Sequence, residues 1–190
     1  MDIGFDCLWS PEHYFADHSF IPDNIQLMTH LAAKHTHIDV GTAAVILPCH
    51  DPLRVAEQIV LLDILSEGRL RFGMGRGLAR REFEGFRLSM DESRGRFDEA
   101  PSMIINALET GFIEGDGPMY KQPRTGVRPR PQRYMAGRLY SVATSEESVE
   151  SVAKLGDVRM VIFAYCSLEM RVPVINYGHE LHLKHHGRPA

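Results

Sequence analysis

Apolar residues along the chain fall into two repeating patterns, which predict strands and helices in alternation. Short apolar runs are typical of buried strands, and the first half of the chain holds three of them, at residues 7–9, 38–42 (with apolar character continuing to 47) and 70–74. Apolar positions three or four residues apart predict a helix over 24–34 with Asp23 as its N-cap. They predict a second helix after Asp51, with Pro52 at its first position.

The alternation continues in the second half of the chain. The predicted elements there are a helix over 92–110, a strand over 139–143, a helix over 145–155 and a strand over 160–163. Residues 75–91 are predicted to be a polar connection. Residues 112–133, rich in glycine, proline and arginine, are predicted to leave the alternation as an excursion or hairpin.

Strands that alternate with helices predict a parallel sheet covered by helices, because each connection crosses over in the right-handed sense. The pattern fits an open doubly wound sheet or a (β/α)8 barrel equally well. In both folds the chemistry lies at the carboxyl ends of the strands. The unusual residues of this chain cluster at those ends, which predicts one site built from several loops.

Composition narrows the classes of partner. The chain has 190 residues, a net charge of -4 and a pI near 6.2, so nothing in its charge favours nucleic acid or an anionic membrane. Its three cysteines are far apart, which argues against a disulfide scaffold or zinc site. No signal peptide and no bilayer-length apolar stretch is visible. We therefore expect a soluble, cytoplasmic protein.

The segment 65–77 carries the strongest chemical signal. A turn at Gly68 leads into a short strand, and Arg76 follows between two glycines. The bare backbone of Gly73 and Gly75 lets a flat cofactor approach, and an arginine at a strand end can bind a phosphate bidentately. Glycines with this spacing also occur in ordinary strand-to-helix turns, and the segment alone does not separate the two interpretations.

His13 is the candidate for proton transfer. It follows the first strand, and histidine can hold or release a proton near neutral pH. The alternative is a partly exposed histidine that stacks on Tyr14 or Phe15.

A second group of residues suits a phosphate. Arg94 lies at the start of a helix, and Thr144, Ser145 and Ser148 lie at the start of another, where backbone N–H groups favour anions. The alternatives are a surface ion pair for Arg94 with Glu92 or Asp98, and simple helix capping for the hydroxyls.

Two further segments are open to more than one interpretation. Ala43 and Ala44 leave room for a planar ring against the backbone, although tight packing explains small residues equally well. The histidines near the carboxyl end have a spacing that resembles a metal site, at 179, 182, 185 and 186. No carboxylate or cysteine completes that set, so we expect a solvated tail and no metal.

These residues stand in blocks that resemble the bacterial luciferase-like flavin-dependent monooxygenases, in the family's order and spacing. The blocks are 4–15 (GFDCLWSPEHYF), 39–48 (DVGTAAVILP), 51–57 (DPLRVAE), 61–77 (LLDILSEGRLRFGMGRG), 82–86 (EFEGF) and 92–94 (ESR). The resemblance implies a (β/α)8 TIM barrel that takes reduced FMN from a separate reductase. It further implies that oxygen reacts at the flavin, through a flavin peroxide, to oxidise a small organic substrate.

The resemblance also assigns roles to single residues. His13 matches the family's active-site histidine, and Ala43 and Ala44 match the pair beside the isoalloxazine ring. A reactive cysteine of the light-emitting catalytic subunits is replaced here by Gly75, so light emission is not implied.

The phosphate-binding positions of the family are matched as well. They correspond to Arg76, Arg94, Thr144, Ser145 and Ser148.

The chain is short for this family. Only five of the eight expected strands are visible, so residues 1–190 are interpreted as one luciferase-like domain truncated at both ends. Exposed strand edges predict a homodimer. Two alternative functions stay open: a deazaflavin (F420)-dependent oxidoreductase with the same barrel, and a non-catalytic flavin-binding fragment.

Overall fold

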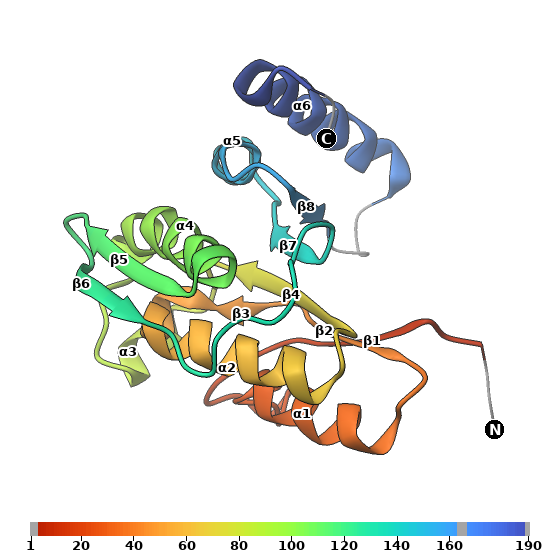
Figure 1. Ribbon diagram of the computed structural model, residues 1–190. Helices are drawn as coiled ribbons and strands as arrows, with labels where there is room; N and C mark the ends of the chain where they lie inside the picture. Colours follow the sequence, from red (N-terminus) through yellow and green to blue (C-terminus); the bar gives the residue numbers. More distant parts are fainter. Residues whose placement is uncertain (1–3, 163–166, 189–190) are drawn as a thin grey trace.

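A parallel sheet forms the centre of the computed structural model, which describes residues 4–162 and 167–188 (Figure 1). Its strands are β1 (Cys7–Ser10), β2 (Asp39–Thr42), β3 (Val45–Ile46), β4 (Leu70–Gly75), β7 (Leu139–Val142) and β8 (Val158–Val161). They follow the order β1-β2-β4-β7-β8, with β3 also paired to β4, and every pairing is parallel. The α/β architecture with a parallel sheet is therefore confirmed.

β2 and β3 together occupy one strand position in the sheet. The predicted strand over 38–47 is interrupted at Ala43 and Ala44, which are joined by a cis peptide bond. Both halves pair with β4, since Val40 lies beside Leu70 and Val45 beside Met74. When β2 and β3 are counted as one strand, the described residues supply five parallel strands, as the sequence predicts.

Helices connect and cover the strands. They are α1 (Asn24–Lys34), α2 (Pro52–Leu65), α3 (Arg80–Gly85), α4 (Ser93–Thr110), α5 (Glu146–Lys154) and α6 (Leu168–His186), with short 3-10 turns η1 (Leu47–Cys49) and η2 (Met90–Glu92). The predicted caps are confirmed: Asp23 accepts a hydrogen bond from the backbone of Gln26 at 2.8 Å, and Asp51 accepts one from Arg54 at 3.1 Å. The predicted excursion is an antiparallel hairpin of β5 (Phe112–Asp116) and β6 (Lys121–Gly126).

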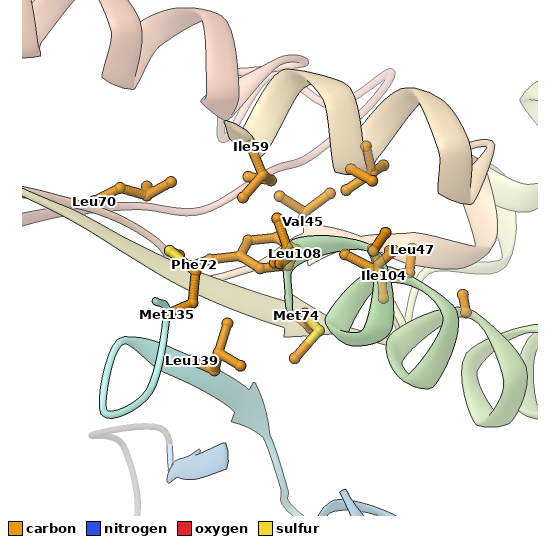
Figure 2. Close-up of a cluster of buried hydrophobic side chains, with 14 of the residues drawn as sticks. Val45, Leu47, Ile59, Leu70, Phe72, Met74, Ile104, Leu108, Met135 and Leu139 are labelled. Carbon is orange, nitrogen blue, oxygen red and sulfur yellow. The ribbon is translucent and has the colours of Figure 1, made fainter. Parts of the chain in front are cut away.

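The hydrophobic core lies between the sheet and its helices. Figure 2 shows side chains from β3, β4, α2, α4 and β7 meeting in one cluster, with Phe72 and Met74 of β4 at its centre. Both side chains are fully buried. Alternate residues of β4 point the other way, toward the inner face of the sheet, because side chains alternate along a strand. The core therefore fixes β4 and, with it, the position of Gly75 and Arg76 at its carboxyl end.

Two predicted loops are helical instead. Residues 75–91, expected as a polar connection, contain α3, whose Phe83 is completely buried. The expected solvated tail is α6, which packs on α5 (Figure 1). There His182 is only 4% exposed, and the ring of His186 lies 2.8 Å from the carbonyl oxygen of Ala153. Apolar contact with α5 orders this segment despite its polar composition.

The last strand is shifted from its predicted position. β8 begins at Val158, two residues earlier than expected, because Gly156 with φ of 83° forms the turn after α5 and only Asp157 separates it from the strand. Part of the predicted strand, residue 163, lies outside the described residues. Across the described part of the chain, no helix has both the length and the apolar character that a bilayer crossing requires.

Candidate functional site

A cavity of about 140 Å³ opens at the carboxyl ends of β1, β3, β4 and β7. It brings together seven of the eight residues predicted for the site, which are His13, Ala43, Ala44, Arg76, Thr144, Ser145 and Ser148. These residues come from four separate loops, and the parallel topology is what places the four loops at one edge of the sheet.

One wall of the cavity is small and apolar. Ala43, Ala44, Gly75 and Val142 contribute to it. The hydroxyl of Thr42, just before the two alanines, donates to the carbonyl of Gly73 at 3.0 Å and accepts from its N–H at 2.9 Å. These bonds hold β2 against β4 directly below the wall.

Asn24 supports the same wall through buried hydrogen bonds, a role that was not predicted from the sequence. Its side-chain amide is buried and donates to the carbonyl oxygens of Ser10 (3.1 Å) and Ala44 (3.2 Å). It thereby ties the end of β1 to the segment between β2 and β3. A polar residue among the buried positions of α1 was the available signal, since buried amides are almost always hydrogen-bonded.

Glu12 is a second buried support. Its carboxylate accepts from the backbone N–H of Ile46 at 2.5 Å and lies 2.9 Å from Nε2 of His50, which in turn lies 2.8 Å from the hydroxyl of Tyr14. Burial, reinforced by the nearby Glu12 carboxylate, raises the pKa of Tyr14 far above its usual value. The same two causes raise the pKa of the Cys49 thiol to about 12. Both groups therefore stay protonated at neutral pH.

His13 is held at the rim of the cavity by Glu82 of α3. Nδ1 of His13 lies 3.2 Å from Oε1 of Glu82, and the backbone N–H of Tyr14 donates to the same oxygen at 3.0 Å. The His13 side chain is 37% exposed, whereas that of Glu82 is 1% exposed. The His13 ring stands edge-on to His18, with centroids 4.9 Å apart. It does not stack on Tyr14 or Phe15, which was the alternative considered from the sequence.

Arg76 brings positive charge to the cavity. Its Nη1 donates to the hydroxyl of buried Ser93 at 3.0 Å. None of the ion pairs among the described residues involves Arg76. Glu12 and Glu82 line the same cavity, but their carboxylates are held by backbone N–H groups and by histidines. A guanidinium outside such ion pairs is suited to an anionic ligand.

Arg94 is the one predicted site residue that does not line this cavity. Its Nε lies 3.0 Å from Glu147 and its Nη1 lies 3.6 Å from Asp98, contacts close enough for ion pairs but without hydrogen-bond geometry. It borders a neighbouring hollow between α4 and α5. The ion pair with Asp98, the alternative weighed from sequence, is therefore present, and phosphate binding by Arg94 stays a prediction.

The three hydroxyl residues form the start of α5. Backbone N–H groups of Thr144 and Ser145 donate to the Ser148 hydroxyl at 2.9 and 2.8 Å, and the Ser148 N–H donates to the Ser145 hydroxyl at 3.3 Å. This is a capping box formed by Ser145 and Ser148. The residues therefore cap the helix and line the cavity at the same time.

Comparison with known proteins decides the family, because residues 2–170 match the sequence pattern of the luciferase-like monooxygenases. The chain belongs to this family. The luciferase-like chain is 29% identical over 188 residues to the alkanal monooxygenase alpha chain of Photorhabdus laumondii, and the match covers 95% of the chain and 52% of that relative. It thus spans about half the length of the curated relatives that it matches.

Solved structures agree on the fold of the luciferase-like chain. The monooxygenase RslO1 of Streptomyces bottropensis superposes with a TM-score of 0.83 at 26% identity, covering 96% of this chain and 56% of that one. An F420-dependent tetrahydromethanopterin reductase of Methanopyrus kandleri superposes at 0.77 with 22% identity, covering 98% and 55%. The oxygenating part of 3,6-diketocamphane monooxygenase of Pseudomonas putida, in complex with FMN, superposes at 0.78 with 16% identity, covering 98% and 55%. The chain therefore has the fold of an incomplete TIM barrel.

Proposed function

We propose that the luciferase-like chain supplies the flavin site of a monooxygenase that uses reduced FMN and molecular oxygen to oxidise a small organic substrate. The observation that carries the proposal is the cavity itself. It combines a small apolar wall, the Arg76 guanidinium, which forms no ion pair among the described residues, and a partly exposed histidine.

The polar end of the cavity suits the phosphate of FMN. Arg76 and the hydroxyls of Thr144 and Ser145 line it together. The Arg76 guanidinium supplies charge and a planar pair of donors, while the start of α5 supplies the positive end of a helix dipole. The Ser145 and Ser148 hydroxyls lie 3.1 Å apart, so a phosphate at the start of α5 would meet the two together.

The apolar wall suits the flavin ring. Ala43 and Ala44 present only methyl groups and backbone, and Gly75 presents backbone alone. A planar ring can lie against such a surface and exclude water from its face. Asn24 and Thr42 keep the wall in place through bonds to backbone groups, so its shape does not depend on the ligand.

When bound, reduced FMN supplies the electrons with which oxygen is activated. The task of the chain is then to keep water out and to handle protons. His13 is the group for proton transfer, because imidazole exchanges a proton near neutral pH and its ring lies at the cavity rim. We further propose that a separate reductase delivers the reduced flavin and that the protein acts as a homodimer.

A direct test compares reduced FMN with reduced deazaflavin F420. Photoreduced FMN is mixed with oxygen in a stopped-flow instrument, with and without excess chain, while reduced F420 is titrated in parallel. The proposal predicts a saturable change in the rate of FMN oxidation and oxygen uptake. Saturable binding and turnover of reduced F420 alone, with FMN oxidation unchanged, would assign the protein to the deazaflavin enzymes.

A further inference from the structure

We propose that Glu82 is a positioning residue that fixes His13 as the Nδ1–H tautomer and leaves Nε2 as the ring nitrogen that serves the cavity. The functional meaning of this assignment rests on the proposed function, whereas the tautomer itself is a property of the chain alone.

The hydrogen bonds at one carboxylate oxygen assign the proton. Oε1 of Glu82 receives the backbone N–H of Tyr14 at 3.0 Å, so this oxygen acts as an acceptor. Nδ1 of His13 lies 3.2 Å from the same oxygen. Two acceptors cannot form a hydrogen bond, so Nδ1 carries the hydrogen and donates it. In a neutral imidazole, Nε2 is then bare.

Packing holds the carboxylate where this bond requires it. The segment 82–86 forms a unit against the loop that carries His13: Phe83 is fully buried, and the Phe86 ring stands edge-on to Tyr14 with centroids 4.6 Å apart. Gly85 lets Phe15 close in, because a Cβ at that position would lie 2.2 Å from the Phe15 ring. The Glu82 side chain is 1% exposed and has little freedom to turn away.

The other nitrogen of His13 faces no competing partner. Within the described residues, no hydrogen bond or ion pair involves Nε2 of His13. The neighbouring His18 contacts the His13 ring edge-on. The Arg81 guanidinium contacts His18, with Nη2 3.4 Å from Nδ1 of that ring. His13 and Glu82 both line the cavity. Because Glu82 already occupies Nδ1, Nε2 is the ring nitrogen left available to a bound ligand.

This arrangement sets the direction of the first proton transfer. A bare Nε2 accepts a hydrogen bond or a proton from the ligand before it gives one back. Once the ring is protonated, Glu82 remains at Nδ1 and stabilises the imidazolium, as a buried carboxylate does for a general base. His13 therefore acts first as an acceptor.

Histidine-labelled ¹⁵N NMR tests the assignment in the full chain without flavin. Long-range ¹H–¹⁵N correlations are recorded at a pH of about 8.5, where an imidazole of ordinary pKa is neutral. The His13 signals are identified by their loss in His13→Ala. Wild type is expected to show the Nδ1–H pattern, and so is Glu82→Gln, whose amide oxygen can accept both bonds.

Removal of the acceptor should release the ring. Glu82→Leu is expected to lose the Nδ1–H pattern in favour of a mixture containing the Nε2–H form, while Glu84→Gln, at an exposed position of the same helix, keeps the wild-type pattern. A dominant Nε2–H form in wild type would overturn the proposal. So would an unchanged pattern in folded Glu82→Leu. The wild-type and Glu82→Gln spectra decide the matter even if Glu82→Leu fails to fold. Because no flavin is present, a failure of FMN binding cannot produce either result.

Discussion

Arg76 and Arg94 differ in the partners of their guanidinium groups. Within the described residues, Arg76 lines the cavity and bonds to a serine hydroxyl alone, whereas Arg94 already contacts two carboxylates. A ligand phosphate would therefore meet an uncompensated charge at Arg76 and a compensated one at Arg94. Substituting each in turn compares the two predicted phosphate ligands.

Arg76→Gln is expected to weaken the binding of reduced FMN about ten-fold or more, since a charge-assisted hydrogen bond contributes about 1.5–3 kcal/mol. Arg94→Gln removes ion pairs worth about 0–1 kcal/mol and should change the dissociation constant far less. Anaerobic fluorescence titration measures both. Equal losses in the two variants would contradict the placement of the phosphate beside Arg76.

His13→Ala should separate binding from chemistry. The side chain is 37% exposed and is not among the groups proposed to hold the phosphate, so the dissociation constant for reduced FMN is expected to change by only about two-fold. Loss of a proton-transfer group typically slows a reaction about 10²–10⁴-fold. With an accepted substrate, oxygen use should therefore yield hydrogen peroxide in place of product. Unaltered coupling of oxygen to product would remove the catalytic role of His13.

At the scale of the element, the joint between β2 and β4 shapes the site. A Cβ at Gly73 would lie 2.0 Å from the backbone oxygen of Thr42, so no side chain fits there without separating the strands. Gly73→Ala is expected to destabilise the fold by about 1–3 kcal/mol or more, as overpacking does. Urea unfolding followed by circular dichroism gives the value.

Gly95→Ala in α4 is the matched control. Its Cβ would meet only the flexible Met119 side chain at 3.3 Å, and alanine is the better helix former by about 1 kcal/mol. This variant should keep wild-type stability or gain some. A Gly73→Ala protein as stable as the Gly95→Ala protein would show that β2 and β4 are not closely held.

The elements that sequence predicted well are those whose ends are marked locally. Asp23 and Asp51 mark the starts of α1 and α2, and Gly111, in the left-handed region at φ of 77°, ends α4. α3 has six residues, too few for a helical repeat to show. α6 has little periodic pattern and an internal proline, Pro173, so its order depends on contact with α5.

In the candidate site, too, the residues marked by local sequence were predicted and those that depend on distant contacts were not. Arg76 follows β4 directly and His13 lies three residues after β1, so topology alone predicts that they meet at one edge. The buried partners Glu12, Asn24 and Glu82 could not be assigned from sequence, because their roles depend on contacts with residues 14 to 69 positions away. The partners of Arg94 depend likewise on how α4 meets α5.

At the scale of the whole molecule, the sheet ends in two outer strands, β1 and β8. Large apolar side chains are also exposed, among them Trp9 on β1 at 41% and Leu168 on α6 at 68%. Unpaired strand edges and exposed apolar groups favour association. We expect the purified chain to form dimers or larger species.

Size-exclusion chromatography with light scattering measures that association. A monomer that unfolds cooperatively and binds no hydrophobic dye would contradict the expectation. It would also mean that the exposed apolar groups are covered within one chain.

We propose that one cavity of this chain holds a flavin by its phosphate. Anaerobic titration of the chain with reduced FMN and with reduced riboflavin, which lacks the phosphate, is the decisive measurement. We expect FMN to bind about ten-fold more tightly or better, because charge-assisted bonds from Arg76 and its neighbours are made only to the phosphate. Equal affinity for the two flavins, or no binding of either, would contradict it.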